Sequence, residues 1–362
     1  MLSSRWRVFI PNCLVLTYNL LAVWFLSCCV SAQSNSHVKH LISRAEAGHL
    51  KEEMELAHIF RMGLGVPRDT AEAAKWTLKA ANQGDPVAQT NIGYAYFMGL
   101  GVSVNQAEAF KWFQRAAVSN FAPAEHDLGI LLIRGLGVQQ DIASGVRWVT
   151  KAAQQNFAPA ELHLGILYFL GIGMERDQTT AIPWIRKAVK QDYAPAEFLL
   201  GQLYEDGQGV AADLSQATQW FEKAAARGDA RAQNALGRLY EKGTGVPRDK
   251  AEAAHWYTLA AENGNAFACA NLARMDAGVD GGTPDTASAY FWALAARRMQ
   301  SPDTDPLPSE FVEALRKSQS SEDALRIEAQ VEEWIQNHPS SLSADEYRLP
   351  NLHEHDPVSP KP

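Results

Sequence analysis

The sequence predicts an all-α protein built from about seven stacked helix–loop–helix repeats, because three features recur every 36 residues. A tryptophan occurs once per period, at Trp76, Trp112, Trp148, Trp184, Trp220, Trp256 and Trp292. A Gly-x-Gly triplet occurs in six periods, at Gly63/Gly65, Gly99/Gly101, Gly135/Gly137, Gly171/Gly173, Gly207/Gly209 and Gly243/Gly245. An aliphatic residue followed by Ala or Gly occurs in all seven, at Leu56, Ile92, Leu128, Leu164, Leu200, Leu236 and Leu272. The register holds without insertion or deletion, so we expect one continuous stack.

Each period is predicted to hold two helices. In the second copy, Ala88, Ile92, Ala95 and Tyr96 have the spacing of one helical face, and Gly99 suits the left-handed end of that helix. A short acceptor side chain then precedes the second helix, where it can cap the orphan amides. These residues are Asp69, Asn105, Asp141, Asp177, Asp213, Asp249 and Asp285.

Glycines inside the first helices indicate close packing between helices. A mid-helix glycine costs about 1 kcal/mol relative to alanine, and the close approach of a neighbouring helix would offset that cost. The five positions are Gly93, Gly129, Gly165, Gly201 and Gly237. We expect each tryptophan to lie between the two helices of its repeat and the next repeat.

The expected repeats span 49–84, 85–120, 121–156, 157–192, 193–228, 229–264 and 265–300, within a solenoid over 41–300. Leu41 to Gly48 would cap the first repeat. A C-terminal cap is expected over 309–338, as two helices, because terminal repeats need covering. Its covering side chains would be Phe311, Leu315, Leu325, Ile327, Val331 and Trp334. The proline-rich segment 339–362 is predicted to be disordered.

The repeat pattern resembles that of the Sel1-like repeat family, which is related to the tetratricopeptide repeat. Residues 229–264 carry it most fully, with Leu236-Gly237, Gly243, Gly245-Val246 and Ala260-Ala261 around Trp256. The resemblance implies a right-handed α-solenoid used as an adaptor or scaffold. Some secreted bacterial members are cysteine-rich and have been linked to β-lactam binding. This chain lacks the paired cysteines of that subgroup.

The composition of the chain excludes several other classes of protein. With 46% hydrophobic and 20% charged residues the chain is neither collagen-like, nor wholly disordered, nor a polytopic membrane protein. Its 33 basic and 41 acidic residues give a net charge of −8, which disfavours nucleic acid as a partner.

Residues 1–32 have the pattern of a signal peptide. Arg5 and Arg7 precede an apolar stretch, and Val30-Ser31-Ala32 places small residues before a cleavage site. The sequence therefore predicts export to the periplasm or to the outside of the cell, and the lumen of the endoplasmic reticulum is also compatible. Two alternatives stay open: an uncleaved anchor from Val8 to Val30, and lipidation at Cys28. Cleavage would leave Cys269 as the sole cysteine, which we interpret as a core residue.

Candidate partner-binding residues lie on the first helices, about 200° from the packing stripe. They are apolar in the second to fourth repeats, at Tyr94, Phe97, Met98, Ile130, Ile133, Ile166, Phe169 and Leu170. Apolar residues facing away from a packing stripe suggest a surface for a hydrophobic segment of a protein or peptide partner. The alternatives are that first helices pack together there, or that the chain dimerises through them.

No catalytic, phosphate-binding or metal motif occurs in the sequence, and no cofactor is expected. His126 and His163 are interpreted as solvated histidines, and His353-x-His355 lacks further ligands. A ladder of cations, Lys79, Arg115, Lys151, Lys187 and Lys223, is attributed mainly to the dipoles of the second helices. We therefore expect an exported interaction scaffold, not an enzyme. The alternative is a cell-envelope enzyme such as a β-lactam or peptidoglycan hydrolase, and membrane contact is expected only if the N-terminal segment is uncleaved or lipidated.

Overall fold

A computed structural model describes residues 37–279, 281–299 and 307–338, which form helices joined by short loops, with no strand among them. The predicted all-α class is confirmed. The contacts divide the chain into two compact units, one ending at Asp141 and the other beginning at Ile142. The expected single stack is therefore divided, and the division falls between the two helices of the third repeat.

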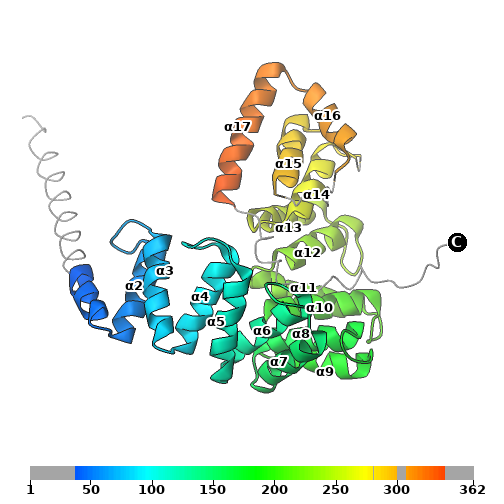
Figure 1. The fold of residues 1–362 in the computed structure, drawn as a ribbon. Coiled ribbons are helices and arrows are strands. Elements are labelled where there is room, and N and C mark those ends of the chain that lie inside the picture. Colours follow the sequence, from blue (N-terminus) through cyan, green and yellow to red (C-terminus); the bar gives the residue numbers. More distant parts are fainter. Residues whose placement is uncertain (1–36, 280, 300–306, 339–362) are drawn as a thin grey trace, which may run out of the picture. The chain divides into compact units, whose positions relative to one another are not determined.

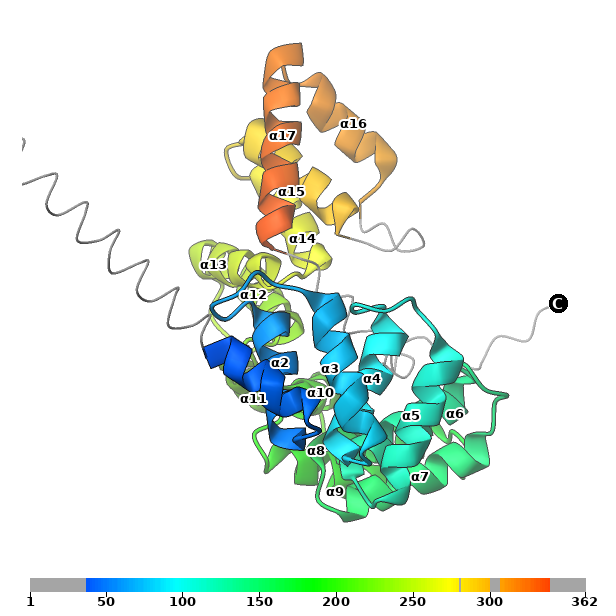
Figure 2. The ribbon, with the colours of Figure 1, turned by 60° about the vertical axis from the view of Figure 1, so that its left-hand side comes forward.

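Unit 1 is a row of antiparallel helices in which each helix packs against the next (Figures 1 and 2). Helical residues 37–46 come first. They are followed by α2 (Leu50–Met62), α3 (Thr70–Asn82), α4 (Pro86–Met98), α5 (Gln106–Val118) and α6 (Ala122–Arg134).

Unit 2 continues the same alternation of first and second helices. Its helices are α7 (Ile142–Gln154), α8 (Ala158–Leu170), α9 (Gln178–Val189), α10 (Ala194–Asp206), α11 (Leu214–Ala226), α12 (Ala230–Lys242), α13 (Lys250–Glu262), α14 (Ala266–Asp276), α15 (Thr286–Arg298), α16 (Ser309–Lys317) and α17 (Ser321–Asn337). Across both units the first helices begin 36 residues apart, at Leu50, Pro86, Ala122, Ala158, Ala194, Ala230 and Ala266. The predicted period is thus the period of the helices.

The loop inside each repeat is held at both ends by the residues that the sequence singled out. Gly99 ends α4 at a φ of 73°, in the left-handed region, and its amide donates to the carbonyl of Ala95. Gly101 lacks a Cβ where one would overlap the carbonyl of Thr70. The predicted N-caps are formed at Asp69, Asn105, Asp177, Asp213, Asp249 and Asp285. Each such cap contributes about 1 kcal/mol to stability.

The mid-helix glycines allow the two helices of a repeat to approach closely, as expected. A Cβ built at Gly93 would lie 2.8 Å from the ring of Phe113, and one at Gly201 would lie 2.6 Å from the ring of Phe221. At Gly165 the nearest atom is a side-chain carbon of Ile185, at 2.7 Å. The side chain over the glycine belongs to the residue that follows each tryptophan, a position that we did not single out from the sequence.

Tryptophans pack against the repeat that precedes their own, and Trp292 also meets the ring of Trp334 in α17 at 5.5 Å. Trp112 lies in a core cluster with residues of α3 and α4, and Trp256 packs against a cluster drawn from α10, α11 and α12. For Trp112 and Trp256 the observed core contacts lie on the preceding repeat instead of the expected next one. Since the following residue points onto the first helix of the same repeat, the neighbouring tryptophan is turned toward the preceding second helix.

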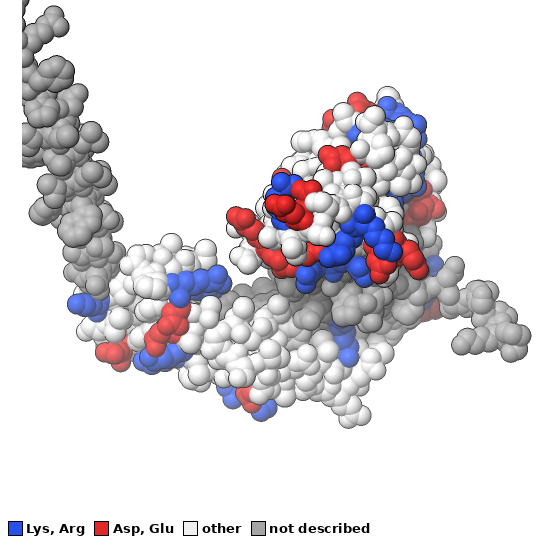
Figure 3. Space-filling model, turned by 90° about the horizontal axis from the view of Figure 1, so that it is seen from above, with Lys and Arg blue, Asp and Glu red and all other residues white. Residues whose placement is uncertain are grey.

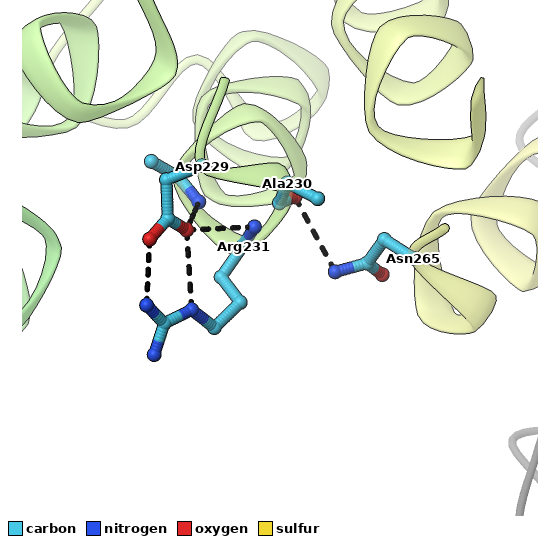
Figure 4. Close-up of polar contacts among 5 residues, drawn as sticks. Asp229, Ala230, Arg231 and Asn265 are labelled. Atoms are coloured by element: carbon cyan, nitrogen blue, oxygen red, sulfur yellow. Dashed lines mark hydrogen bonds and ion pairs between the residues drawn. The ribbon is translucent and has the colours of Figure 1, made fainter. Parts of the chain in front are cut away.

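Polar contacts also join successive first helices (Figure 4). Asp229 caps α12 by accepting from the amides of Arg231 and Ala232, and its other carboxylate oxygen pairs with the Arg231 guanidinium at 2.6 Å. Asn265, the cap of α14, donates from its side-chain amide to the carbonyl of Ala230 at 3.3 Å. The start of one first helix is thereby tied to the start of the next.

Helices α16 and α17 pack against α15, as expected for a C-terminal cap. Leu315, Ile327 and Val331 are buried in the core cluster of α13–α17. Leu325, in contrast, is 64% exposed, so its predicted role in the cap is wrong. The buried stripe of α17 runs through Ala324, Ile327 and Val331, and Leu325 lies about 100° from it.

Cys269 is a core residue, as interpreted. It is fully buried on α14, and burial raises the pKa of its thiol to about 12. Among the residues that the structure describes, none of the helices has the length and apolar character that a membrane crossing requires.

We predict that Gly201→Ala destabilises the protein. The added Cβ would overlap the ring of Phe221, and overpacking of this kind costs about 1–3 kcal/mol, which exceeds the gain of about 1 kcal/mol in helix propensity. The free energy of unfolding would be measured by urea denaturation. In a Phe221→Ala background the same substitution should become neutral or stabilising. An equal loss in both backgrounds would contradict the packing explanation.

Candidate partner-binding groove

The structure divides the eight predicted partner-binding residues into two groups. Phe97, Ile130, Ile133 and Phe169 are at most 5% exposed, so their assignment to a binding surface is corrected. Tyr94, Met98, Ile166 and Leu170 are half-buried, and a partner role stays a prediction for them.

Contacts between first helices explain the burial. Helix α4 contacts α6, first helix against first helix. Phe169 of α8 lies in one cluster with Leu199 and Leu203 of α10. For these positions the packing alternative weighed from the sequence is the one observed, because each first helix has two buried sides.

A groove with a volume of about 530 Å³ opens in unit 1 between α2, α3 and α4. We call it the N-terminal groove. Its lining residues are Met54, Ala57, His58, Arg61, Arg68, Thr70, Ala73, Ala74, Thr77, Asn91, Tyr94, Ala95, Met98 and Leu100. Tyr94 and Met98 were predicted as partner-binding residues. The contribution of α3 was not predicted, because the repeat pattern of the second helices indicates only a structural role.

The floor of the groove is apolar and small. Ala57, Ala73, Ala74 and Ala95 are buried in it. The hydroxyl of Thr77 donates to the carbonyl of Ala73 at 2.8 Å, so this buried polar group is already satisfied. A floor of small side chains leaves room for a side chain from a partner.

The walls are larger and the rim is cationic. The ring of Tyr94 meets that of Phe113 edge-on at 5.2 Å, which holds it against the body of unit 1. Leu100 is 50% exposed at the edge. Arg61, Arg68 and His58 are exposed, and Nη2 of Arg61 lies 3.4 Å from Nδ1 of His58. No lining residue carries a carboxylate.

The cation ladder of the second helices is structural, for a reason beyond the helix dipole. Each cation lies over the indole ring three residues before it. The distances to the ring centre are 4.2 Å for Lys79, 4.5 Å for Arg115, 5.2 Å for Lys151, 3.7 Å for Lys187 and 3.9 Å for Lys223. Cation–π contacts at exposed sites contribute about 0.5–1 kcal/mol each.

A column of buried polar side chains near the starts of the first helices was missed by sequence reasoning. Its members recur every 36 residues and are Glu53, Gln89, Glu125, Glu161, Glu197 and Gln233. Three of them accept a hydrogen bond from the residue thirty positions later, at 2.7 Å for Glu53 from Gln83, 2.6 Å for Glu161 from Gln191, and 3.0 Å for Gln233 from Asn263. In these three repeats the column links the first helix to the end of its second helix, so we assign it to stability.

Two of these carboxyls are electrostatically perturbed. Burial raises the pKa of Glu161, opposed by Lys187 and by the hydrogen bond from Gln191. Burial also raises the pKa of Glu197, opposed mainly by Arg227, whose Nε lies 3.7 Å from a carboxylate oxygen. Perturbed acids can mark catalytic sites. Here, however, they recur along the fold with structural partners.

The histidines differ from expectation. His126 is buried, not solvated, and its Nδ1 lies 3.0 Å from the Oδ1 of buried Asp127. His163 is half-buried. His353 and His355 lie outside the described residues. In the described part of the chain, no group of three or more His, Cys, Asp and Glu side chains is arranged to hold a metal ion.

Comparisons with known proteins agree with this architecture. The Sel1 repeat family matches residues 53–85, 86–117, 122–157, 158–193, 194–229, 230–265 and 266–301. The chain therefore belongs to the Sel1 repeat family. Proteins of this family are generally protein-interaction scaffolds, and the fold is typically a non-catalytic binding scaffold.

The chain is also similar to proteins of solved structure. A Sel1 repeat protein from Oxalobacter formigenes is 35% identical, with a TM-score of 0.61, over 70% of this chain and 100% of that chain. A protective antigen of uropathogenic Escherichia coli strains displaying an SLR fold is 25% identical, with a TM-score of 0.45, over 90% of this chain and 76% of that one. An immunity protein from Pseudomonas aeruginosa is 19% identical, with a TM-score of 0.44, over 76% and 89%. No curated protein matches the chain.

We predict that Glu161→Gln raises the stability of the protein at pH 7. The folded-state pKa of Glu161 lies above its ordinary value of 4.5. The stabilising contribution of Glu161 is therefore fully present below its ordinary pKa and is lost as the pH rises through its folded-state pKa. Glutamine can keep the bond from Gln191, and it can donate to the carbonyl eight residues earlier, as Gln89 and Gln233 do.

Thermal unfolding of wild type and Glu161→Gln would be followed from pH 7 to pH 4. The difference between the two proteins should shrink toward acid pH. Glu175→Gln, an exposed substitution in the same repeat with the same change of charge, is the control. A midpoint for Glu161→Gln that is lower than that of the control at pH 7 would contradict the electrostatic assignment.

Proposed function

We propose that the protein is an exported scaffold that binds a polypeptide partner, and that the N-terminal groove is the binding site. The groove is the observation that supports the proposal. It combines an apolar floor, the half-buried Tyr94 and Met98, and polar groups at its rim. Its volume lies within the range of roughly 300–1,000 Å³ that is usual for binding pockets.

A polypeptide suits this groove better than other classes of partner. The floor of alanines can accept an apolar side chain, and the exposed Asn91 and the half-buried Thr70 at the edge can hydrogen-bond to a backbone. Nucleic acid is disfavoured by the net charge of −8. The signal-peptide pattern of residues 1–32 supports a compartment outside the cytoplasm, periplasmic or secreted, where such a scaffold would meet its partner.

The groove would be tested by selecting binders from a displayed library of random peptides. We expect Tyr94→Ser combined with Met98→Ser to weaken the selected peptides at least about tenfold, because aromatic and methionine side chains contribute strongly to interfaces. Binding would be measured by fluorescence anisotropy, and melting curves would show that the variant still folds.

The matched control is Ile166→Ser combined with Leu170→Ser, which changes the same two repeat positions in the fourth repeat. If the N-terminal groove is the site, affinity should survive this change, and the partner role predicted from the sequence for Ile166 and Leu170 would then be dropped. Loss of binding in the control but not in the groove variant would move the binding site to the fourth repeat. Unchanged binding in both would exclude the first-helix face as the site.

Export would be tested by expressing the chain with its own N-terminus in a Gram-negative host. We expect the mature protein in the periplasmic fraction, beginning at Gln33 after cleavage following Ala32. Ala32→Asp should block that cleavage. A wild-type protein that keeps residues 1–32 in the membrane would favour the anchor, lipid on Cys28 would favour lipidation, and a cytoplasmic location would contradict export.

A further inference from the structure

The N-terminal groove concentrates positive charge without acidic residues to balance it. Arg61 and Arg68 line it, and both are exposed. The nearest acid in sequence is Asp69, whose carboxylate is turned to the amide of Glu72 as the cap of α3. Within the described part of the chain, neither Arg61 nor Arg68 forms an ion pair with a carboxylate.

Arginines in the corresponding region of unit 2 have internal partners instead. Nη2 of Arg238 on α12 lies 2.7 Å from both carboxylate oxygens of Glu205 on α10. The other repeats place Phe97, Ile133, Phe169, Glu205, Glu241 and Ala277 at the position of Arg61. The arginine in the first repeat is thus a departure from the periodic pattern.

Arg68 shows the same contrast. Two other repeats also have arginine at its position: Arg176, which lies 5.8 Å from the ring centre of Phe169, and Arg248, whose Nε donates to the carbonyl of Glu241 at 2.9 Å. Over the C-terminal helices α15–α17, basic and acidic side chains are interspersed (Figure 3). There Arg298 pairs with Glu332 at 2.9 Å, and Arg326 pairs with Asp323 at 2.7 Å. These arginines of unit 2 therefore all interact with other residues of the same chain.

We infer that the N-terminal groove selects an acidic polypeptide segment in which an apolar side chain is flanked by carboxylates. This inference rests on the proposed function. The apolar side chain would fill the space above Ala73 and Ala74, and the carboxylates would pair with Arg61 and Arg68 at the rim. Arginine suits this role because its planar guanidinium can bind a carboxylate through two parallel hydrogen bonds.

Charge complementarity has a further consequence for the strength of binding. Exposed ion pairs contribute less than about 1 kcal/mol each, and salt screens them. Most of the binding free energy therefore has to come from burial of the apolar side chain. The two arginines account for the preference for acidic flanking residues. We expect about a tenfold preference at low ionic strength, and a smaller one at high salt.

An array of synthetic peptides of equal length would test the inference on the full chain. The central residue would be Leu, Met, Phe or Tyr, and the flanking residues would be Glu, Gln or Lys. We expect the glutamate-flanked peptides to bind about tenfold more tightly than the glutamine-flanked ones. The double variant Arg61→Glu/Arg68→Glu should reverse the order in favour of lysine flanks, with an unchanged melting temperature.

The control is Lys242→Glu/Arg248→Glu, which makes the same change of net charge at exposed positions of the sixth repeat and should leave the preference intact. Equal binding of all flanks, unaffected by Arg61→Glu/Arg68→Glu but lost in the Tyr94→Ser/Met98→Ser variant, would overturn the inference and leave the proposed function standing. Binding that neither groove variant alters would overturn both.

Discussion

The architecture depends on the contact between a glycine in the middle of a first helix, as in the second, fourth, fifth and sixth repeats, and the side chain that lies over it from the second helix. At Gly93, Gly201 and Gly237 that side chain is the aromatic ring of Phe113, Phe221 or Tyr257. The absence of a Cβ lets the two helices approach until the ring fills the space between them. With this ring turned inward, the adjacent tryptophan is directed at the preceding repeat. One local constraint therefore sets both the geometry inside a repeat and the direction in which repeats are joined.

Most of the fold could be predicted from the sequence because its causes are local. The caps, the left-handed glycines and the 36-residue register each depend on residues close together in the chain, as at Asp69 or Gly99. The features that could not be predicted depend on how helices from different repeats pack together. The burial of Ile130 and Phe169 results from a second packing side of the first helices, which a single helical stripe does not reveal. The division after Asp141 leaves no mark in a register that continues across it.

The N-terminal groove could likewise be predicted only in part from the sequence. Tyr94 and Met98 could be found because apolar residues at exposed-face positions attract attention in a periodic sequence. Arg68 and Ala73 could not, because they come from the loop and the second helix, where the pattern suggests only structural roles. A signal was nevertheless present. Arg61 stands where the other repeats have aromatic, aliphatic or acidic residues, and departures from a repeat's own pattern are where a scaffold can acquire specificity.

The backward orientation of the tryptophans also bears on how such a chain is made. A ribosome releases the chain from its N-terminus, so the surface that receives Trp112, formed by α3 and α4, exists before α5 is complete. The same holds for Trp220, which packs against a cluster of α8, α9 and α10, and for Trp256, whose cluster comes from α10, α11 and α12. Each new second helix can thus pack against helices that have already been synthesised, and folding can proceed in the order of translation without contacts to distant segments.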